Sequence, residues 1–134
     1  MNAPSKDIKE MIEDMLEDSS GTVVTKYPIN RVLFDESKPN CATLLDIPSG
    51  SPQLTMDRVK YEFLSVQFKV RCTDYDDGWG FISSVVDLLH GRANEVWNDS
   101  YYSLIECLNG PGFLERENQR TIFVANFNIQ RREV

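Results

Sequence analysis

The chain holds few side chains of the kinds that catalyse reactions or bind metals. It has one histidine, His90, and its three cysteines, Cys41, Cys72 and Cys107, stand far apart. Zinc sites and disulfide frameworks use paired, closely spaced ligands. We therefore expect reduced, buried thiols and no metal or cofactor.

The densest acidic group, residues 74–77 (Asp-Tyr-Asp-Asp), has the composition of a calcium loop but not its spacing. Counted from Asp74, an EF-hand loop needs glycine at position 6 and glutamate at position 12. Trp79 and Val85 stand there instead. Acids at the start of a helix are favoured by its dipole, so these residues are expected to begin a helix.

No nucleophile motif, P-loop, zinc-protease motif or dinucleotide fingerprint occurs in the chain. Cys107 stands in an apolar segment, whereas reactive thiols lie in exposed, electropositive surroundings. We expect no catalytic residues and no enzyme activity.

Composition narrows the class of protein. The 134 residues are enough for one domain, residues 1–134, with a sizeable core. The net charge of −7 argues against nucleic acid as a ligand, because phosphate binding needs clustered Lys and Arg. No apolar run is long enough to span a membrane, and the first 18 residues, with six acids and two lysines, do not resemble a signal peptide.

Hydrophobic periodicity predicts the main elements. Residues 5–18 and 74–90 have apolar stripes at helical spacing, with Ser5 as the expected N-cap of the first helix. The long strand 58–72 alternates with period two, and closing strands are expected at 101–108 and 121–130.

Shorter and irregular segments lie between these elements. Short strands are expected at 22–27, 31–34 and 42–47, and loops at 48–57 and 109–120. Residues 131–134 are expected to form a charged tail.

This order predicts an α+β fold with a mostly antiparallel, mixed sheet and two helices packed on one face. The other face is expected to be polar, either solvated or placed against a neighbouring subunit. It would display Gln67, Lys69, Arg71, Asn126, Asn128 and Gln130.

Several stretches of the chain form a pattern by their order and spacing. They are 35–52, 61–75, 88–91 (LLHG), 104–106 (LIE), 110–114 (GPGFL), 117–118 (EN) and 123–132 (FVANFNIQRR). Together they resemble the tail terminator proteins of long-tailed bacteriophages, also called tail completion or minor capsid proteins. The resemblance covers about residues 8 to 132.

The resemblance implies a mixed sheet with two helices on one side and a ring, usually of six subunits. The ring would lie on the head-proximal end of the tail tube in the virion, after assembly in the host cytoplasm. It would stop tube polymerisation and offer a joining surface to the head connector or a head-completion protein. No enzyme activity or cofactor is implied.

In such a ring, DNA would pass through the lumen without specific binding, and no membrane is involved. Six copies of −7 make −42, and a net-negative conduit disfavours phosphate adhesion.

Ring closure requires two different, complementary patches. One hypothesis pairs the acidic helix 5–18 with the basic residues at 69, 71, 131 and 132, and the loops at 35–40, 48–57 and 110–120 are candidates for docking onto the tube and connector. The candidate ring or partner residues are Lys38, Gln53, Lys69, Arg71, Phe113, Arg116, Arg120, Arg131 and Arg132.

Two alternatives remain open at this point. One is another phage neck or head-completion adaptor. The other is a small acidic cytoplasmic inhibitor or immunity module, whose charge would mask a basic partner.

Overall fold

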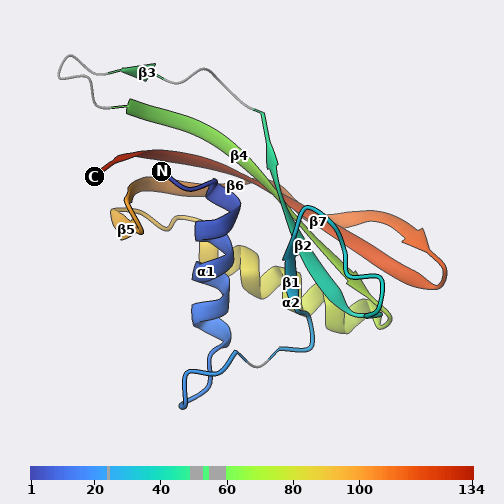
Figure 1. The fold of residues 1–134 in the computed structure, drawn as a ribbon. Coiled ribbons are helices and arrows are strands. Elements are labelled where there is room, and N and C mark those ends of the chain that lie inside the picture. Colours follow the sequence, from blue (N-terminus) through green and yellow to red (C-terminus); the bar gives the residue numbers. More distant parts are fainter. Residues whose placement is uncertain (24, 49–52, 55–59) are drawn as a thin grey trace.

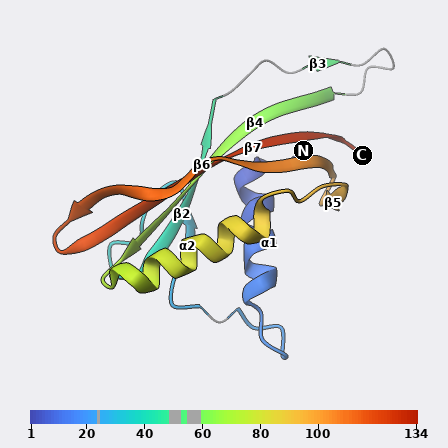
Figure 2. The same ribbon diagram turned by 180° about the vertical axis from the view of Figure 1, so that it is seen from behind.

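Two helices lie together on one face of a curved sheet (Figures 1 and 2). The computed structural model describes residues 1–134 except 24, 49–52 and 55–59. Helix α1 spans Pro4–Leu16 and helix α2 spans Tyr75–Leu89. They begin and end within two residues of the bounds predicted for them.

The described strands form one sheet in the order β1-β2-β4-β7-β6-β5, with β3 pairing on the edge of β4. Only β1 and β2 run parallel among these pairs; every other described pair is antiparallel. The predicted α+β fold with a mixed, mostly antiparallel sheet is therefore confirmed. The strands are β1 (Ile29–Arg31), β2 (Cys41–Ile47), β3 (Gln53–Leu54), β4 (Lys60–Cys72), β5 (Glu95–Trp97), β6 (Ser100–Glu117) and β7 (Arg120–Glu133).

Strands β4 and β7 form the centre of the sheet, in unbroken register from Tyr61 opposite Arg132 to Cys72 opposite Thr121. Successive side chains alternate between the two faces. The helix-facing residues from Val66 to Cys72 and from Phe123 to Ile129 are apolar and buried. The other set forms the open face, as predicted, with Gln67 opposite Asn126, although Arg71 of that set is buried.

One hydrophobic cluster joins both helices to the sheet. Burial of apolar side chains, each contributing about 1.5–3 kcal/mol, is the main force that holds these layers together. Its fully buried members include Ile8, Met11, Ile12, Leu44, Val66, Phe68, Val70, Ile82, Val85, Leu89, Ile105, Phe123 and Ala125.

The start of α1 differs from the prediction. Ser5 is not the N-cap: the helix begins at Pro4, and Ala3 precedes it without a side-chain cap. The Ser5 backbone N–H instead donates to Asp46 Oδ1 (2.9 Å), and its hydroxyl donates to Asp46 Oδ2 (2.7 Å). A carboxylate from β2 therefore satisfies a free amide in the first turn of the helix.

The short strands predicted between α1 and β2 are misplaced. The described residues of 22–27 form no strand apart from an isolated bridge between Glu17 and Val23, and residue 24 lies outside the described set. The strand predicted at 31–34 is β1, which ends at Arg31 because Val32 has φ of +81° and leaves the sheet. The strand predicted at 42–47 is confirmed as β2.

The loop predicted at 109–120 is instead a continuation of β6 and β7. The strands turn at Asn118 and Gln119, both with positive φ (46° and 66°), as a two-residue hairpin turn requires. The stretch 110–112 (Gly-Pro-Gly) lies within β6, where register shifts interrupt its pairing with β7. The predicted charged tail also belongs to β7.

Two further differences concern the edges of the sheet. Strand β5 was not predicted; it is short and lies between Asn94 and Asn98, which both have positive φ. The loop predicted at 48–57 contains β3, and residues 58 and 59 of the predicted long strand lie outside the described set, as does most of that loop.

Helix α2 begins with a side-chain cap and a close contact. Asp74 accepts a hydrogen bond from the Asp77 backbone N–H (3.1 Å), so these acids begin a helix as expected. A Cβ at Gly78 would lie 2.2 Å from Cys72 Sγ, whereas one at Gly80 would meet nothing within 4 Å. Only Gly78 is needed for the approach of helix to sheet.

These two glycines predict opposite effects of the same substitution. Gly78→Ala should lower the free energy of unfolding by about 1–3 kcal/mol, because the helix must move off β4. Gly80→Ala, the matched control, should raise it by about 0.5–1 kcal/mol through higher helix propensity. Urea unfolding followed by circular dichroism measures both; equal effects would contradict this packing.

Candidate functional site

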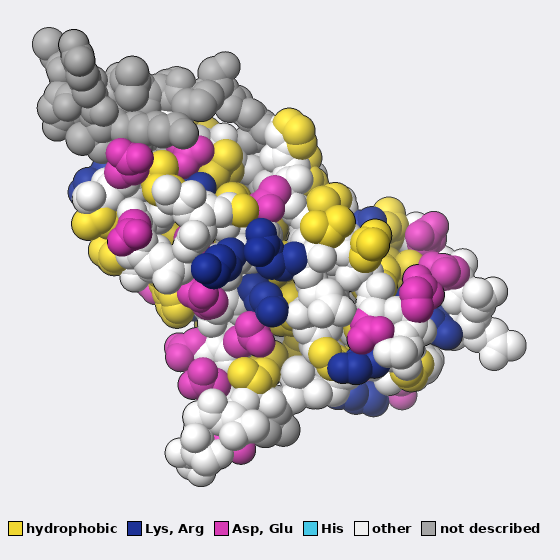
Figure 3. Space-filling view, viewed as in Figure 1, with side chains coloured by type: hydrophobic (Ala, Val, Ile, Leu, Met, Phe, Trp, Pro, Cys, Tyr) yellow, Lys and Arg dark blue, Asp and Glu magenta, His cyan; other side chains and the backbone are white. Residues whose placement is uncertain are grey.

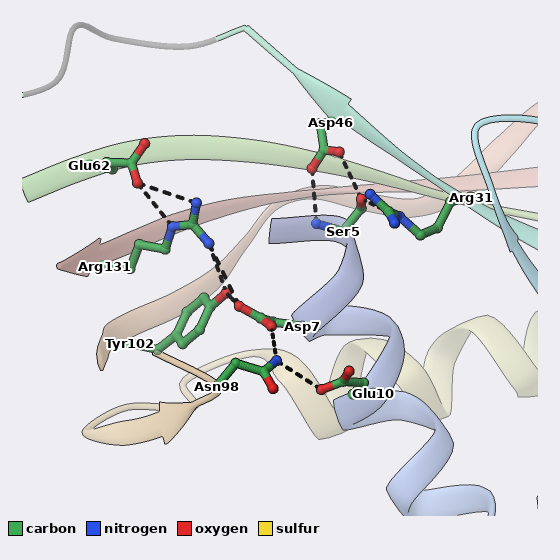
Figure 4. Close-up of polar contacts among 9 residues, drawn as sticks. All are labelled: Ser5, Asp7, Glu10, Arg31, Asp46, Glu62, Asn98, Tyr102 and Arg131. Atoms are coloured by element: carbon green, nitrogen blue, oxygen red, sulfur yellow. Dashed lines mark hydrogen bonds and ion pairs between the residues drawn. The ribbon is translucent and has the colours of Figure 1, made fainter. Parts of the chain in front are cut away.

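A network of charged groups lies where α1 meets the sheet (Figure 4). Arg131 of β7, only 3% exposed, places Nη1 3.7 Å from Asp7 Oδ2 and Nη2 3.2 Å from Glu62 Oε1. Its Nη1 also donates to the Tyr102 hydroxyl (3.2 Å). One guanidinium thus joins α1, β4, β6 and β7.

Asp7 is fully buried and has further partners. The Tyr102 hydroxyl donates to its Oδ2, and the Asn98 side-chain amide donates to its Oδ1 (2.5 Å) and to Glu10 Oε2 (3.0 Å). Burial, reinforced by the Asp7 carboxylate, raises the pKa of Tyr102. The tyrosine remains a neutral donor at ordinary pH.

These contacts make the network a structural joint. Buried charges are tolerated when they are paired and hydrogen-bonded, and breaking such a pair strands the remaining charge. Arg131 was predicted to contact another subunit's acidic helix, but it pairs with α1 of its own chain. It is therefore removed from the candidate interface.

The nine predicted interface residues fall into three groups along the sheet. The first group lies at the end that carries β5. Arg132 lies over the Tyr101 ring, 4.5 Å from its centroid, and the backbone of Gln53 in β3 pairs with Tyr61 of β4. Arg131, beside them in sequence, is buried.

The second group lies near the middle of the open face. Lys69 is half-buried there, and Lys38 is exposed in the loop between β1 and β2. Arg71 is 1% exposed beneath that loop, where its Nη2 donates to the carbonyls of Asp35 (2.8 Å) and Lys38 (2.7 Å). Arg71 fastens the loop to the sheet, so its predicted role as a surface contact is wrong.

The third group, Phe113, Arg116 and Arg120, lies in the outer part of the β6–β7 hairpin, where Arg120 pairs with Glu117 beside the turn. Phe113 is 56% exposed and lies opposite Phe123, while Arg116 lies opposite Thr121. Phe123 and Thr121 belong to the buried side of β7, so Phe113 and Arg116 share the helix-side face of the hairpin. We call Phe113 and Arg116 the hairpin knob.

Two aromatic residues of α2 complete this exposed end. Tyr75 and Trp79 pack edge-on against the Phe123 ring at 4.9 and 5.5 Å, yet 50% of Tyr75 and 41% of Trp79 is exposed. Exposed aromatic groups beside arginine are typical of protein–protein contacts. Tyr75 and Trp79 lie one helical turn apart, and this spacing was the signal for the exposed pair that the sequence offered.

The open face is rich in uncharged amide and hydroxyl groups. Ser65 Oγ donates to Asn128 Oδ1 (3.1 Å), and Gln67 and Asn126 lie in the neighbouring row. On the side that carries α1, Figure 3 shows Lys and Arg side chains interspersed with Asp and Glu. This view shows no continuous basic surface of the kind that binds nucleic acid.

The cysteine and histidine side chains are arranged for structure. His90 Nδ1 accepts a hydrogen bond from the Cys107 backbone N–H (2.9 Å), and burial raises the pKa of the Cys107 thiol. Cys41 and Cys72 are fully buried. No group of three or more metal-ligating side chains occurs within the described part of the chain.

The helices among the described residues are too short or too polar to cross a bilayer. In comparisons with known proteins, no family model matches the chain and no curated protein matches its sequence.

Neighbouring arginines of β7 test the buried joint. Arg131→Met should lower the free energy of unfolding by about 3–5 kcal/mol, because the buried carboxylate of Asp7 loses its ion-pair partner. Arg132→Met on the open face should cost about 1 kcal/mol or less. Urea titration measures both; Arg131→Lys should fall between them, and a cost for Arg131→Met no greater than for Arg132→Met would refute the joint.

Proposed function

We propose that this chain is a tail terminator of a long-tailed bacteriophage. It forms a ring, of six copies in the usual case, on the head-proximal end of the tail tube. The ring stops tube polymerisation and joins the tail to the head connector or to a head-completion protein. It acts by surface complementarity, without a cofactor or catalytic step.

The observation that most supports the proposal is where the resembling stretches lie. The stretch 61–75 falls on β4 and the entry to α2, the stretches 104–106 and 110–114 fall on β6, and 123–132 falls on β7. These three strands are neighbours in the sheet. Stretches far apart in sequence thus form one continuous part of the molecule, with the hairpin knob at its end.

The exposed surfaces suit a role in assembly. Ring closure needs two unlike patches on each subunit. The hairpin knob with Tyr75 and Trp79 has the aromatic and arginine composition of one such patch.

The net negative charge of the chain is compatible with DNA passage through a ring. A ring of chains with a net charge of −7 each repels phosphate overall, and the amides of the open face give DNA no clustered cations. We propose that DNA crosses the lumen without specific binding.

A tube-capping assay tests this function. Tube subunits polymerising with the protein should give tubes shorter than those formed alone, with the protein at one end by immunogold microscopy. The Lys69→Glu variant, altered only on the open face, tests whether this face contacts the tube.

Other outcomes separate the alternatives. Preferential binding to the purified connector, without an effect on tube length, would favour a head-completion adaptor. Absence from purified virions, with normal tail lengths after gene deletion, would reject both virion roles and favour an acidic inhibitor of a basic partner.

A further inference from the structure

A groove lies between the end of α1 and the first turns of α2. It has a volume of about 500 Å³, and its floor includes Tyr27 and Phe81, whose rings stack at 4.6 Å. A hollow of about 240 Å³ shares Leu16 and Thr25 with it and continues to Glu13. We call the larger hollow the inter-helix groove.

Gly80 leaves this groove open. It lines the groove, and a Cβ built there would meet no atom within 4 Å. Gly80 is thus unlike Gly78, which is packed against β4, and an incoming side chain can reach the backbone of α2.

The rim of the groove is acidic. Asp76 and Asp77 line it beside Lys26, whose Nζ lies 3.1 Å from Asp77 Oδ2, and Glu13 lines the adjoining hollow. The Tyr27 hydroxyl and Lys26 lower the pKa of Asp77, so it stays ionised.

The end of α1 adds to this negative potential. Its last turn has no basic residue, although the end of a helix carries partial negative charge from its free carbonyls. Glu17 and Asp18 follow directly. Lys26 and Lys9 pair with Asp77 and Glu13, so the excess negative charge comes from Asp76, from the residues that follow α1 and from its free carbonyls. An apolar floor with a net negative rim fits a partner that brings an apolar group and a cation.

The hairpin knob carries these two groups. Phe113 is an exposed aromatic side chain, and Arg116 is an exposed cation on the same face of the hairpin. A second copy of the chain therefore offers the chemistry that the groove fits.

The chain's own knob lies on the opposite flank of α2. The groove residue Phe81 packs toward Phe68 of β4, whereas Trp79 packs on Phe123 of β7, opposite Phe113. The two complementary surfaces thus point away from each other, which favours a head-to-tail contact between copies.

Sheet extension is a poorer route to assembly. β5 covers only Ser100–Tyr102 of β6, and along the rest of β6 register shifts and Pro111, which has no N–H, interrupt the pattern that an added strand would follow. At the other edge, β1 has three residues. Contact through side chains remains the better supported mode.

We propose that the hairpin knob of one copy docks into the inter-helix groove of the next. The contact is heterologous, so each copy uses its knob once and its groove once. The inference rests on the proposed function only for the closure of these contacts into a ring. The knob and the groove are the two surfaces that would close that ring.

The test uses two variants, each with one surface destroyed. Phe113→Ser with Arg116→Glu removes the knob and leaves the groove. Asp76→Lys with Gly80→Arg fills the groove and reverses its charge, leaving the knob. All four positions are exposed, and circular dichroism checks folding; Arg116→Glu and Asp76→Lys alone serve if a double variant is unstable.

Light scattering and native mass spectrometry from about 1 µM to about 1 mM give the oligomeric states. The wild type should self-associate, and each variant alone should do so at least about tenfold more weakly. An equimolar mixture should form a heterodimer, since one intact knob meets one intact groove. Asp99→Lys, a charge reversal at an exposed turn residue outside both surfaces, should behave as the wild type.

Three results would overturn the inference: a wild type that stays monomeric over this range, a variant that associates normally, or a mixture without heterodimer. Failure of the proposed function is seen separately. If the two variants form a heterodimer but the wild type does not cap tubes, the contact between knob and groove stands and the terminator role is rejected. If the wild type caps tubes but the groove variant still self-associates normally, only the contact between knob and groove is rejected.

Discussion

The guanidinium of Arg131 lies where α1 meets the sheet, and two carboxylates share it. Alternation along β7 places Gln130 and Arg132 on the open face, so Arg131 must point toward the helices. A buried cation is tolerated only with anionic partners, which constrains Asp7 to stand above it. The position of α1, and with it one wall of the inter-helix groove, follows from this pairing.

Local patterns predicted most of the architecture. Both helices and the central strands follow from apolar periodicity, since burial on one face imposes the spacing. The buried ion pair between Asp7 and Arg131 was not predicted, because the two residues lie at opposite ends of the sequence. Arg131 also belongs to a charged stretch that has the composition of a solvent-exposed tail. The hairpin turn was missed because Asn118-Gln119 lacks the glycine that usually marks one, whereas 110–112 carries strong turn residues inside a strand.

Helix α2 separates two surfaces of different character. On one flank, Phe81 and Gly80 border the acidic groove; on the other, Tyr75 and Trp79 border the hairpin. Gly78 between them lets the helix approach Cys72 closely. The interface residues predicted from composition were partly wrong, because sequence position does not reveal which arginines the sheet buries. Arg71 and Arg131 hold the fold together, whereas Phe113 and Arg116 remain exposed.

The pairing of β4 with β7 has a consequence for biosynthesis. β7 is the last strand of the sheet, and α2, β5 and β6 are made between it and β4. During synthesis, β4 therefore leaves the ribosome before β7, the strand with which it forms its longest pairing. It stays without that partner until β7 has left the exit tunnel. The nascent chain exposes one unpaired edge of β4 throughout that interval, with only the other edge paired to β2, and such an edge makes truncated products prone to aggregate.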